Sequence, residues 1–246
     1  MPKAVSLFTT TATAVVVAGC STAAARHDTF RAGQPAPPPT LPVARDFVSA
    51  IDNPWFPLKP GTVLTYEGED SGTSARDVLR VTRRTKRILG IRATVIDDRV
   101  YERGHLAERT RDYYAQDRDG NVWYLGEDTA TLKPNGRVES REGTFRAGRD
   151  GARAGIFMPA RPMPGDGGWQ EYYVRHAQDR FRILNQHTTA RTPSARTHHA
   201  MLIQETTPLE PGVVDHKIYV RGMGTVREET VTGGNERYQL VSIRHP

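Results

Sequence analysis

The sequence predicts an all-β protein built on a single strongly curved antiparallel sheet, a half-barrel or open barrel of about ten strands with a short N-terminal helix. Three observations lead to this prediction. Apolar and polar residues alternate with a period of two, helical periodicity is scarce after residue 53, and glycine-containing turn signals recur at short intervals. Because about ten twisted strands rarely stay flat and open, we expect the sheet to curve or close.

The first element that we expect is a short helix over residues 44–53, because Phe47, Val48 and Ile51 would fall on one of its sides. Strands are then expected at Thr62–Glu67, Val78–Ile88, Ala93–Glu102, Thr110–Gln116, Asn121–Gly126, Arg180–Thr189 and His199–Thr206. The intervening pairs Asp119-Gly120 and Asn135-Gly136 supply residues that tolerate the positive φ of tight hairpins.

The clearest strand is Val213–Arg221, where apolar and polar side chains alternate strictly. One face carries Val214, His216, Ile218 and Val220, and the other carries Asp215, Lys217, Tyr219 and Arg221. Gly222-Met-Gly224 and Gly233-Gly-Asn235 then turn the chain into Thr225–Val231 and Glu236–Arg244. These three strands predict an antiparallel meander with short hairpin loops.

The stretch from Gly143 to Trp169 is rich in glycine and proline. We expect a long loop here that crosses the sheet. Long loops in compact domains are more often functional than short ones.

The single cysteine, Cys20, follows an apolar run from Ala4 to Ala18 that is too short to span a bilayer. The residues Val17-Ala18-Gly19-Cys20 resemble the bacterial lipobox, which implies lipidation of Cys20 by a diacyl anchor. We therefore expect a signal peptide over 1–19, a lipidated, proline-rich flexible stalk over 20–45 and a β-domain over 46–246. The alternative is an ordinary secretory signal with an incidental cysteine.

This organisation places the protein in the bacterial cell envelope, lipid-anchored on the extracytoplasmic side of a membrane. With 37% hydrophobic and 25% charged residues, the composition is typical of a globular protein and excludes a disordered or multi-span membrane protein. The net charge is +6, but basic and acidic residues are interleaved and form no long stripe. We therefore expect no nucleic-acid partner.

Three segments carry a family resemblance. Asn53-Pro-Trp-Phe-Pro-Leu-Lys-Pro-Gly-Thr62, Asp119-Gly-Asn-Val-Trp-Tyr124 and Gln170-Glu-Tyr-Tyr173 resemble a group of bacterial exported proteins and lipoproteins of unassigned function. The first segment is also similar to the first strand of half-barrel envelope proteins related in fold to lipoprotein carriers. The resemblance implies a concave sheet able to hold an apolar ligand, and it supplies no catalytic residues.

Catalytic and metal-binding motifs are scarce. The eight histidines show no recognisable ligand spacing, and Asp117–Asp128 departs from a calcium loop because Val122 stands where glycine is needed. No serine elbow or phosphate-binding loop occurs. Glu171 and Asp179 could act as a glycosidase pair, but acidic residues are too common for this spacing to be evidence. We expect no metal, no cofactor and no enzymatic activity.

Aromatic side chains give the best binding hypothesis. The candidate ligand-binding residues are Tyr66, Trp123, Tyr124, Phe157, Tyr172, Tyr173 and Arg175. Adjacent strand residues point to opposite faces, so one member of each pair, 123/124 and 172/173, could line the concavity. Arg175 or Arg182 could then meet a lipid headgroup. Core packing alone is the alternative account of the aromatic residues.

The first functional hypothesis is a membrane-anchored, non-enzymatic envelope lipoprotein that binds an apolar or amphipathic ligand, such as a lipid, or an envelope protein partner. A second hypothesis is a structural or assembly factor that holds no small molecule. A third is a hydrolase of envelope polymers, which requires carboxylates that converge in a cleft.

Overall fold

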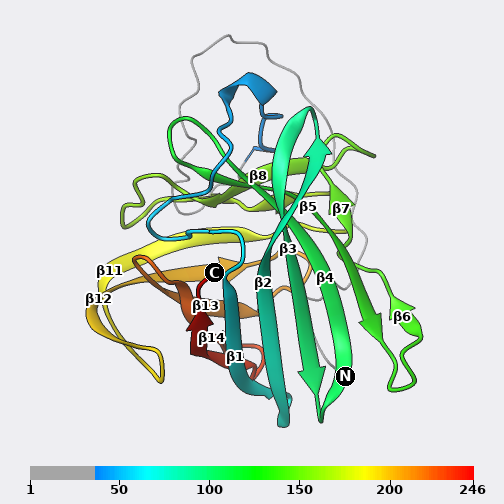
Figure 1. Cartoon of the computed structure of the whole chain (residues 1–246), viewed down its shortest axis with the longest axis vertical. Coiled ribbons are helices and arrows are strands. Elements are labelled where there is room, and N and C mark those ends of the chain that lie inside the picture. The colour runs from blue at the N-terminus through cyan, green and yellow to red at the C-terminus, as the bar shows by residue number, and fades with distance from the viewer. Residues whose placement is uncertain (1–36) are drawn as a thin grey trace.

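The computed structural model describes residues 37–246, so the predictions for the signal peptide and for Cys20 lie outside the described residues. The described chain is almost entirely β-structure in one 15-stranded sheet (Figure 1). The strands of the N-terminal half are β1 (Val63–Asp70), β2 (Thr73–Ile88), β3 (Ile91–Glu102), β4 (His105–Gln116), β5 (Val122–Leu132), β6 (Val138–Ser140), β7 (Phe145–Arg146) and β8 (Arg153–Met158). Those of the C-terminal half are β9 (Gly167–Trp169), β10 (Glu171–Tyr172), β11 (Arg180–Thr192), β12 (Ala195–Thr206), β13 (Val214–Val220), β14 (Gly224–Thr232) and β15 (Arg237–Arg244).

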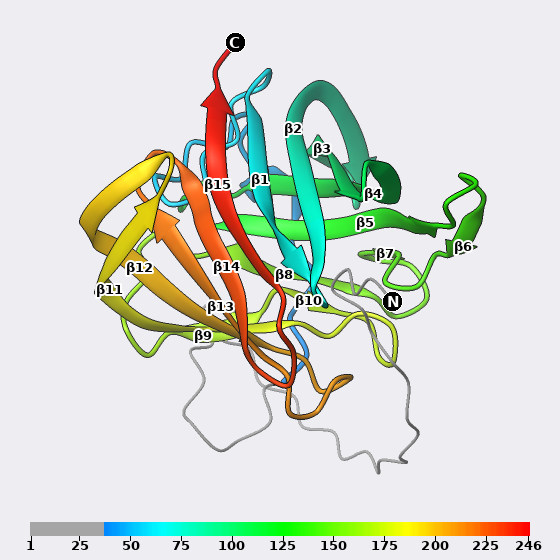
Figure 2. The ribbon, with the colours of Figure 1, turned by 90° about the horizontal axis from the view of Figure 1, so that it is seen from below.

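Two antiparallel meanders make up most of the sheet. Strands β1 to β5 follow one another in space as in sequence, and so do β11 to β15. The two meanders join where β1 pairs with β15, which brings the start and the end of the β-domain side by side (Figure 2). The all-β prediction is confirmed, although the strands are more numerous than the ten expected.

The sheet nearly closes on itself at Gln170. Strand β9 pairs with β11 at one end of the sheet, β10 pairs with β8 at the other, and Gln170 is the one residue between β9 and β10. The Gly155 amide of β8 also donates a hydrogen bond to the Gln170 carbonyl. A Cβ at Gly155 would lie 2.0 Å from the Trp169 carbonyl oxygen, so this close approach requires glycine.

Two sequence predictions about local structure are wrong. The helix expected over 44–53 is only a 3-10 turn, η1 (Ala44–Asp46), because the following segment is held in an irregular path by Gln116. The Gln116 Oε1 atom accepts hydrogen bonds from the amides of Asp52 and Asn53. The loop expected from Gly143 to Trp169 contains β7, β8 and β9, since its glycines allow close strand contacts instead of interrupting the sheet.

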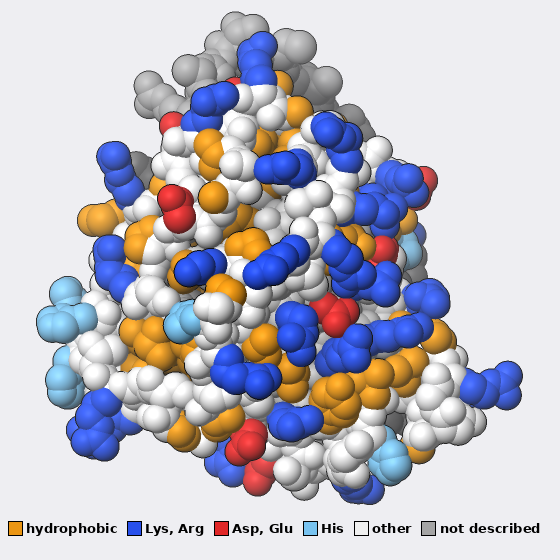
Figure 3. Space-filling view, viewed as in Figure 1, with side chains coloured by type: hydrophobic (Ala, Val, Ile, Leu, Met, Phe, Trp, Pro, Cys, Tyr) orange, Lys and Arg blue, Asp and Glu red, His pale blue; other side chains and the backbone are white. Residues whose placement is uncertain are grey.

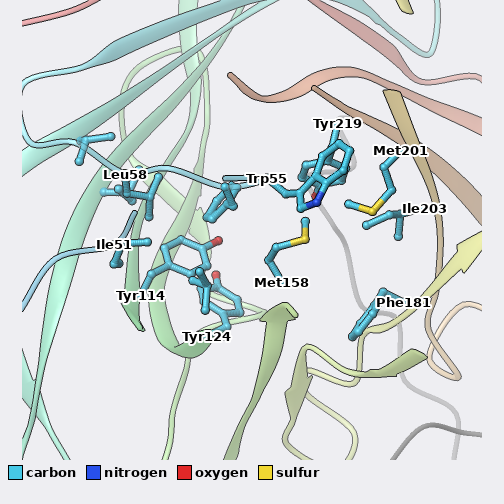
Figure 4. Packing of buried hydrophobic residues seen from close by; sticks show 14 of the residues in the cluster. Ile51, Trp55, Leu58, Tyr114, Tyr124, Met158, Phe181, Met201, Ile203 and Tyr219 are labelled. Carbon is cyan, nitrogen blue, oxygen red and sulfur yellow. The ribbon is translucent and has the colours of Figure 1, made fainter. Parts of the chain in front are cut away.

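The main hydrophobic core fills one part of the barrel interior. Trp55 and Leu58 enter it from the segment before β1, and Met158 and Tyr219 reach it from β8 and β13 (Figure 4). Phe56 belongs to the same cluster. A second core cluster lies between β2–β5 and β8, around Ile91 and Leu125. A third forms where the β11–β12 hairpin packs near β13–β15.

The first two resemblance segments serve this architecture. Asn53 is 2% exposed, and its Nδ2 donates to the carbonyls of Gly120 and Pro159 at 2.9 and 3.0 Å. Asp117 accepts hydrogen bonds from the Asn121 amide and from Trp123 Nε1. These bonds tie the segment before β1 and the turn before β5 to the end of the barrel.

Candidate functional site

The barrel interior contains a cavity of about 640 Å³. Its lining comes from both meanders and from the segments that close the sheet, so the cavity exists only in the nearly closed barrel. It extends to Asp70 and Glu102, the last residues of β1 and β3, and so reaches the end of the barrel where these strands turn. Its size lies within the range of about 300–1,000 Å³ typical of small-molecule sites.

Aromatic rings form the inner wall of the cavity, where it meets the main core. Tyr114 stacks on Tyr124 with ring centroids 4.7 Å apart. Phe157 lies 4.6 Å from Phe56 and 5.0 Å from Tyr114. All four rings line the cavity, and Tyr66 and Tyr238 add two more. The wall is therefore rigid and apolar, with phenol groups at its edge.

The rest of the lining is strongly acidic. Among the described residues, the side chains that line the cavity include 14 carboxylates and a single cation, Lys217. The carboxylates are Asp70, Asp77, Asp98, Glu102, Glu108, Asp112, Glu127, Glu139, Glu142, Glu171, Asp179, Glu205, Glu228 and Glu236. The whole chain has only 28 acidic residues, so half of them face this one space.

The strand register explains how this separation of charge arises. On β4, Glu108, Thr110 and Asp112 line the cavity, while Arg109 and Arg111 line a groove on the other face of the strand. Successive strand residues point to opposite faces, so an alternating acidic and basic sequence places one sign inside. Figure 3 shows the outcome on one face of the molecule, where Lys and Arg side chains are widespread and Asp and Glu are few.

Burial raises the pKa of several carboxyl groups inside the cavity. Burial, and then the charge of Asp98, raises the pKa of Asp112 to about 8. The same two causes raise the pKa of Glu108 to about 7. Burial and the charges of Asp179 and Glu127 raise the pKa of Glu171 well above its usual range. These upward pKa shifts share one physical origin, which is the concentration of negative charge in a space shielded from water.

Lys217 compensates only one part of this charge. Its Nζ lies 2.8 Å from Glu205 and 3.2 Å from Glu228, and Gln170 donates a further hydrogen bond to Glu205 at 2.9 Å. Elsewhere in the cavity, some carboxylates are not fully hydrogen-bonded. One carboxylate oxygen each of Glu171, Asp179 and Glu108 is buried without a hydrogen-bond partner.

Three of the residues predicted from sequence line the cavity. Tyr66 donates a hydrogen bond to the Thr225 carbonyl at 3.0 Å, and Tyr124 donates one to Asp112 Oδ1 at 2.6 Å. Phe157 packs against the aromatic wall. The strand argument for residues 123 and 124 holds, since Tyr124 faces inward and Trp123 instead packs in the second core cluster against Phe47.

The other predicted residues lie away from the cavity lining. Tyr172 packs edge-on against Trp169, and Tyr173 stacks on His176 with centroids 4.3 Å apart. Arg175 is exposed in a turn at φ +67° and is not among the residues that line the cavity. Neither Tyr172 nor Tyr173 is among the residues that line the cavity. Strand β10 ends after two residues, and the one that lines the cavity is Glu171.

The functional residues that sequence reasoning missed are the interior carboxylates. The sequence singles out Glu171 and Asp179 as a pair of carboxylates, but it does not mark Asp112, Glu127 or Lys217 as binding residues. The available signal was the strict alternation of acidic and basic residues from Glu108 to Asp112. Among residues 37–246, no group of three or more His, Cys, Asp or Glu side chains is arranged to hold a metal ion.

Comparisons with known proteins add little. No protein-family model and no curated protein matches the chain. Among solved structures, it is similar to a Bacteroides fragilis protein described as exported with a YmcC-like fold, with TM-score 0.45, 15% identity and coverage of 78% of this chain and 99% of that one. It is also similar to a Parabacteroides distasonis protein described as a lipoprotein, with TM-score 0.40, 13% identity and coverage of 77% and 98%.

Neither of these two descriptions states an activity. Within residues 37–246, no helix has the length and apolar character needed to cross a bilayer.

Proposed function

We propose that this chain is a lipid-anchored, non-enzymatic protein of the bacterial cell envelope that binds a small amphipathic molecule inside its β-barrel. The observation that carries this proposal is the cavity of about 640 Å³ that remains inside an otherwise well-packed barrel. A purely structural factor has no need of such a space, because filling it with apolar side chains would stabilise the fold.

The lining indicates an amphipathic occupant. The aromatic wall around Tyr114, Tyr124 and Phe157 would contact an apolar body, and the surrounding carboxylates would contact a polar group. This combination of an apolar surface with a few convergent polar groups is typical of small-molecule sites. It differs from the purely apolar pocket that the resemblance implied.

Native mass spectrometry of gently purified protein tests this proposal. The chain from Ser21 to Pro246, exported behind a cleavable secretory signal, keeps every described contact, since these contacts lie within residues 37–246. We expect a co-purifying or exchangeable molecule bound at one per chain. Failure to detect any bound or exchangeable small molecule, including an added alkyl probe, would overturn the proposal.

The membrane anchor has a separate test. The change Cys20→Ala should abolish metabolic labelling with palmitate and prevent cleavage before residue 20. Persistent labelling of this variant would contradict the lipobox interpretation.

A second candidate function is hydrolysis of an envelope glycan, because Glu171 and Asp179 both face the cavity. A glycosidase needs one protonated and one ionised carboxyl group. The pKa of Glu171 and that of Asp179 are both raised, chiefly by burial, and this favours binding over hydrolysis. Release of reducing sugar from cell-wall or capsule glycans by the wild-type protein, lost in Glu171→Gln, would reverse that preference.

A further inference from the structure

We propose that the barrel cavity is a receptor site for an organic cation, a molecule that carries an amine or quaternary ammonium group on an apolar body. This inference rests on the proposed function and specifies its ligand class. Three independent features of the cavity support it: its charge balance, its unpartnered carboxylate oxygens and the position of its aromatic wall.

The charge balance is the first feature. Lys217 is the only cation among the described lining residues, and its ammonium group already contacts Glu205 and Glu228. The carboxylates of Asp112, Glu127, Glu171 and Asp179 face the same space. Burial, together with the charges of Asp112 and Asp179, raises the pKa of both Glu127 and Glu171. A bound cation would supply the positive charge that the protein does not place there.

The unpartnered oxygens are the second feature. Glu171 is 2% exposed, it lines the cavity, and its Oε2 has no hydrogen-bond partner. Asp179 also lines the cavity, and its Oδ1 atom is likewise buried without a hydrogen-bond partner. A buried carboxylate without a partner costs free energy, so such groups are usually satisfied by a counter-ion or donor. The N–H groups of an ammonium ion are donors of the required charge.

The aromatic wall is the third feature, and it favours an organic cation over a bare metal ion. Tyr124 belongs to the wall and also donates a hydrogen bond to Asp112, so the apolar and acidic parts of the lining adjoin one another. Aromatic faces attract ammonium groups through the ring quadrupole and also pack against alkyl groups. The described His, Cys, Asp and Glu side chains do not converge on a metal position.

A matched set of three probes tests the inference. Octylammonium, octanol and octanoate share one alkyl chain and differ in charge. Binding of each to the Ser21–Pro246 chain would be measured by isothermal titration calorimetry at pH 7.5 and low salt. We expect octylammonium to bind at least tenfold more tightly than octanol, and octanoate to bind most weakly.

The outcomes separate this inference from the proposed function. Binding of octanol or octanoate as tightly as octylammonium would overturn the cation assignment and leave a small-molecule site. Absence of binding by all three probes would overturn both proposals. These comparisons use the wild-type chain, so they do not depend on whether a variant folds.

A pair of variants locates the site. Glu171→Gln keeps the shape of the side chain but removes its charge, and we expect it to weaken octylammonium binding about tenfold while leaving octanol binding unchanged. Glu67→Gln removes an exposed carboxylate of β1 that does not line the cavity, and it should leave both affinities unchanged. Equal weakening by the two variants would indicate a general effect of net charge and would contradict the placement at Glu171.

Discussion

The ammonium group of Lys217 lies 2.8 Å from a carboxylate oxygen of Glu205 inside the barrel, where the two side chains are 13% and 11% exposed. The pair joins β13 to β12, and Glu228 on β14 contacts the same ammonium group. Removal of one partner from a buried ion pair leaves an uncompensated charge, which is far more costly than the pair is favourable. Lys217 therefore stabilises the packing of β12, β13 and β14 where Glu205 and Glu228 face the cavity.

The first prediction concerns this lysine. Lys217→Met should lower the free energy of unfolding by about 3–5 kcal/mol at pH 8. The loss should be smaller at pH 5, because burial raises the pKa of Glu228 and this group can then take up a proton. Urea unfolding at the two pH values measures both effects. Lys86→Met, at an exposed position of β2, is the control and should change stability by less than about 0.5 kcal/mol. A similar loss in both variants would contradict the prediction.

The second prediction is an unusual dependence of stability on pH. Asp112, with its pKa raised to about 8, and Glu108 and Asp179, with theirs raised to about 7, hold protons in the folded chain that they release on unfolding. These groups stabilise the fold fully at a pH below the pKa values that they have in the unfolded chain. This stabilisation is lost as the pH rises through the higher pKa values that they have in the folded chain. The free energy of unfolding should therefore fall between pH 5 and pH 8, by about 1.4 kcal/mol per pH unit for each excess proton.

Asp112→Asn checks the origin of this dependence. Besides burial, the charges of Asp98 and Glu108 raise the pKa of Asp112, and the hydrogen bond from the Tyr124 hydroxyl lowers it. Without the Asp112 carboxyl group, the fall in stability from pH 5 to pH 8 should become shallower. Asp119→Asn, in an exposed turn, should leave the profile unchanged. Thermal melting of the two variants across this range would contradict the prediction if their profiles were the same.

The strands of this protein could be predicted from sequence because their signals are local. Alternation with period two and glycine-containing turns identify each strand of both meanders, including Val214–Val220, although β5 extends six residues beyond its expected end. The short strands β7 to β10 were missed, because they exist only through contacts with strands distant in sequence. Gly155 carried a loop signal, yet its actual role is the close approach of β8 to Trp169.

The acidic cavity could not be predicted for a related reason. The alternation from Glu108 to Asp112 gives the two faces of β4, but it does not say which face is inside. Acidic residues usually mark the solvent face of a strand. Here the barrel closes around them, and closure depends on the pairing of β1 with β15 and on the chain crossing at Gln170. Tyr66, Tyr124 and Phe157 were found because aromatic residues are expected inside in either case.

The third prediction compares two tyrosines on either side of the sheet. The Tyr124 hydroxyl donates to Asp112 within the cavity at 2.6 Å, and the Tyr113 hydroxyl donates to Asp128 at 2.5 Å. Asp128 also has Arg146 at 2.7 Å, whereas Asp112 faces other carboxylates. At pH 8, Tyr124→Phe should therefore cost about 1.5–3 kcal/mol of unfolding free energy, and Tyr113→Phe about 0.5–1.5. Urea denaturation of the two variants would contradict this if Tyr113→Phe cost more.

The fourth prediction tests whether the first resemblance segment is structural. Asn53 is 2% exposed. Its side-chain Nδ2 donates hydrogen bonds to the carbonyls of Gly120 and Pro159, and its Oδ1 accepts a hydrogen bond from the Trp55 backbone amide at 2.9 Å. Asn53→Ala leaves these backbone groups without their partner, at a cost of about 1–3 kcal/mol for each that stays unsatisfied. Asn135→Ala, in an exposed turn, provides the matched control and should cost less than about 1 kcal/mol.

Ligand affinity then decides between a structural and a binding role for this segment. Asn53 does not line the cavity, so Asn53→Ala protein that remains folded below its lowered melting temperature should bind octylammonium as the wild type does. Calorimetry at 15 °C, with folding verified by circular dichroism, makes this comparison. A tenfold loss of affinity without unfolding would mean that the segment before β1 contributes to the site as well as to the barrel end.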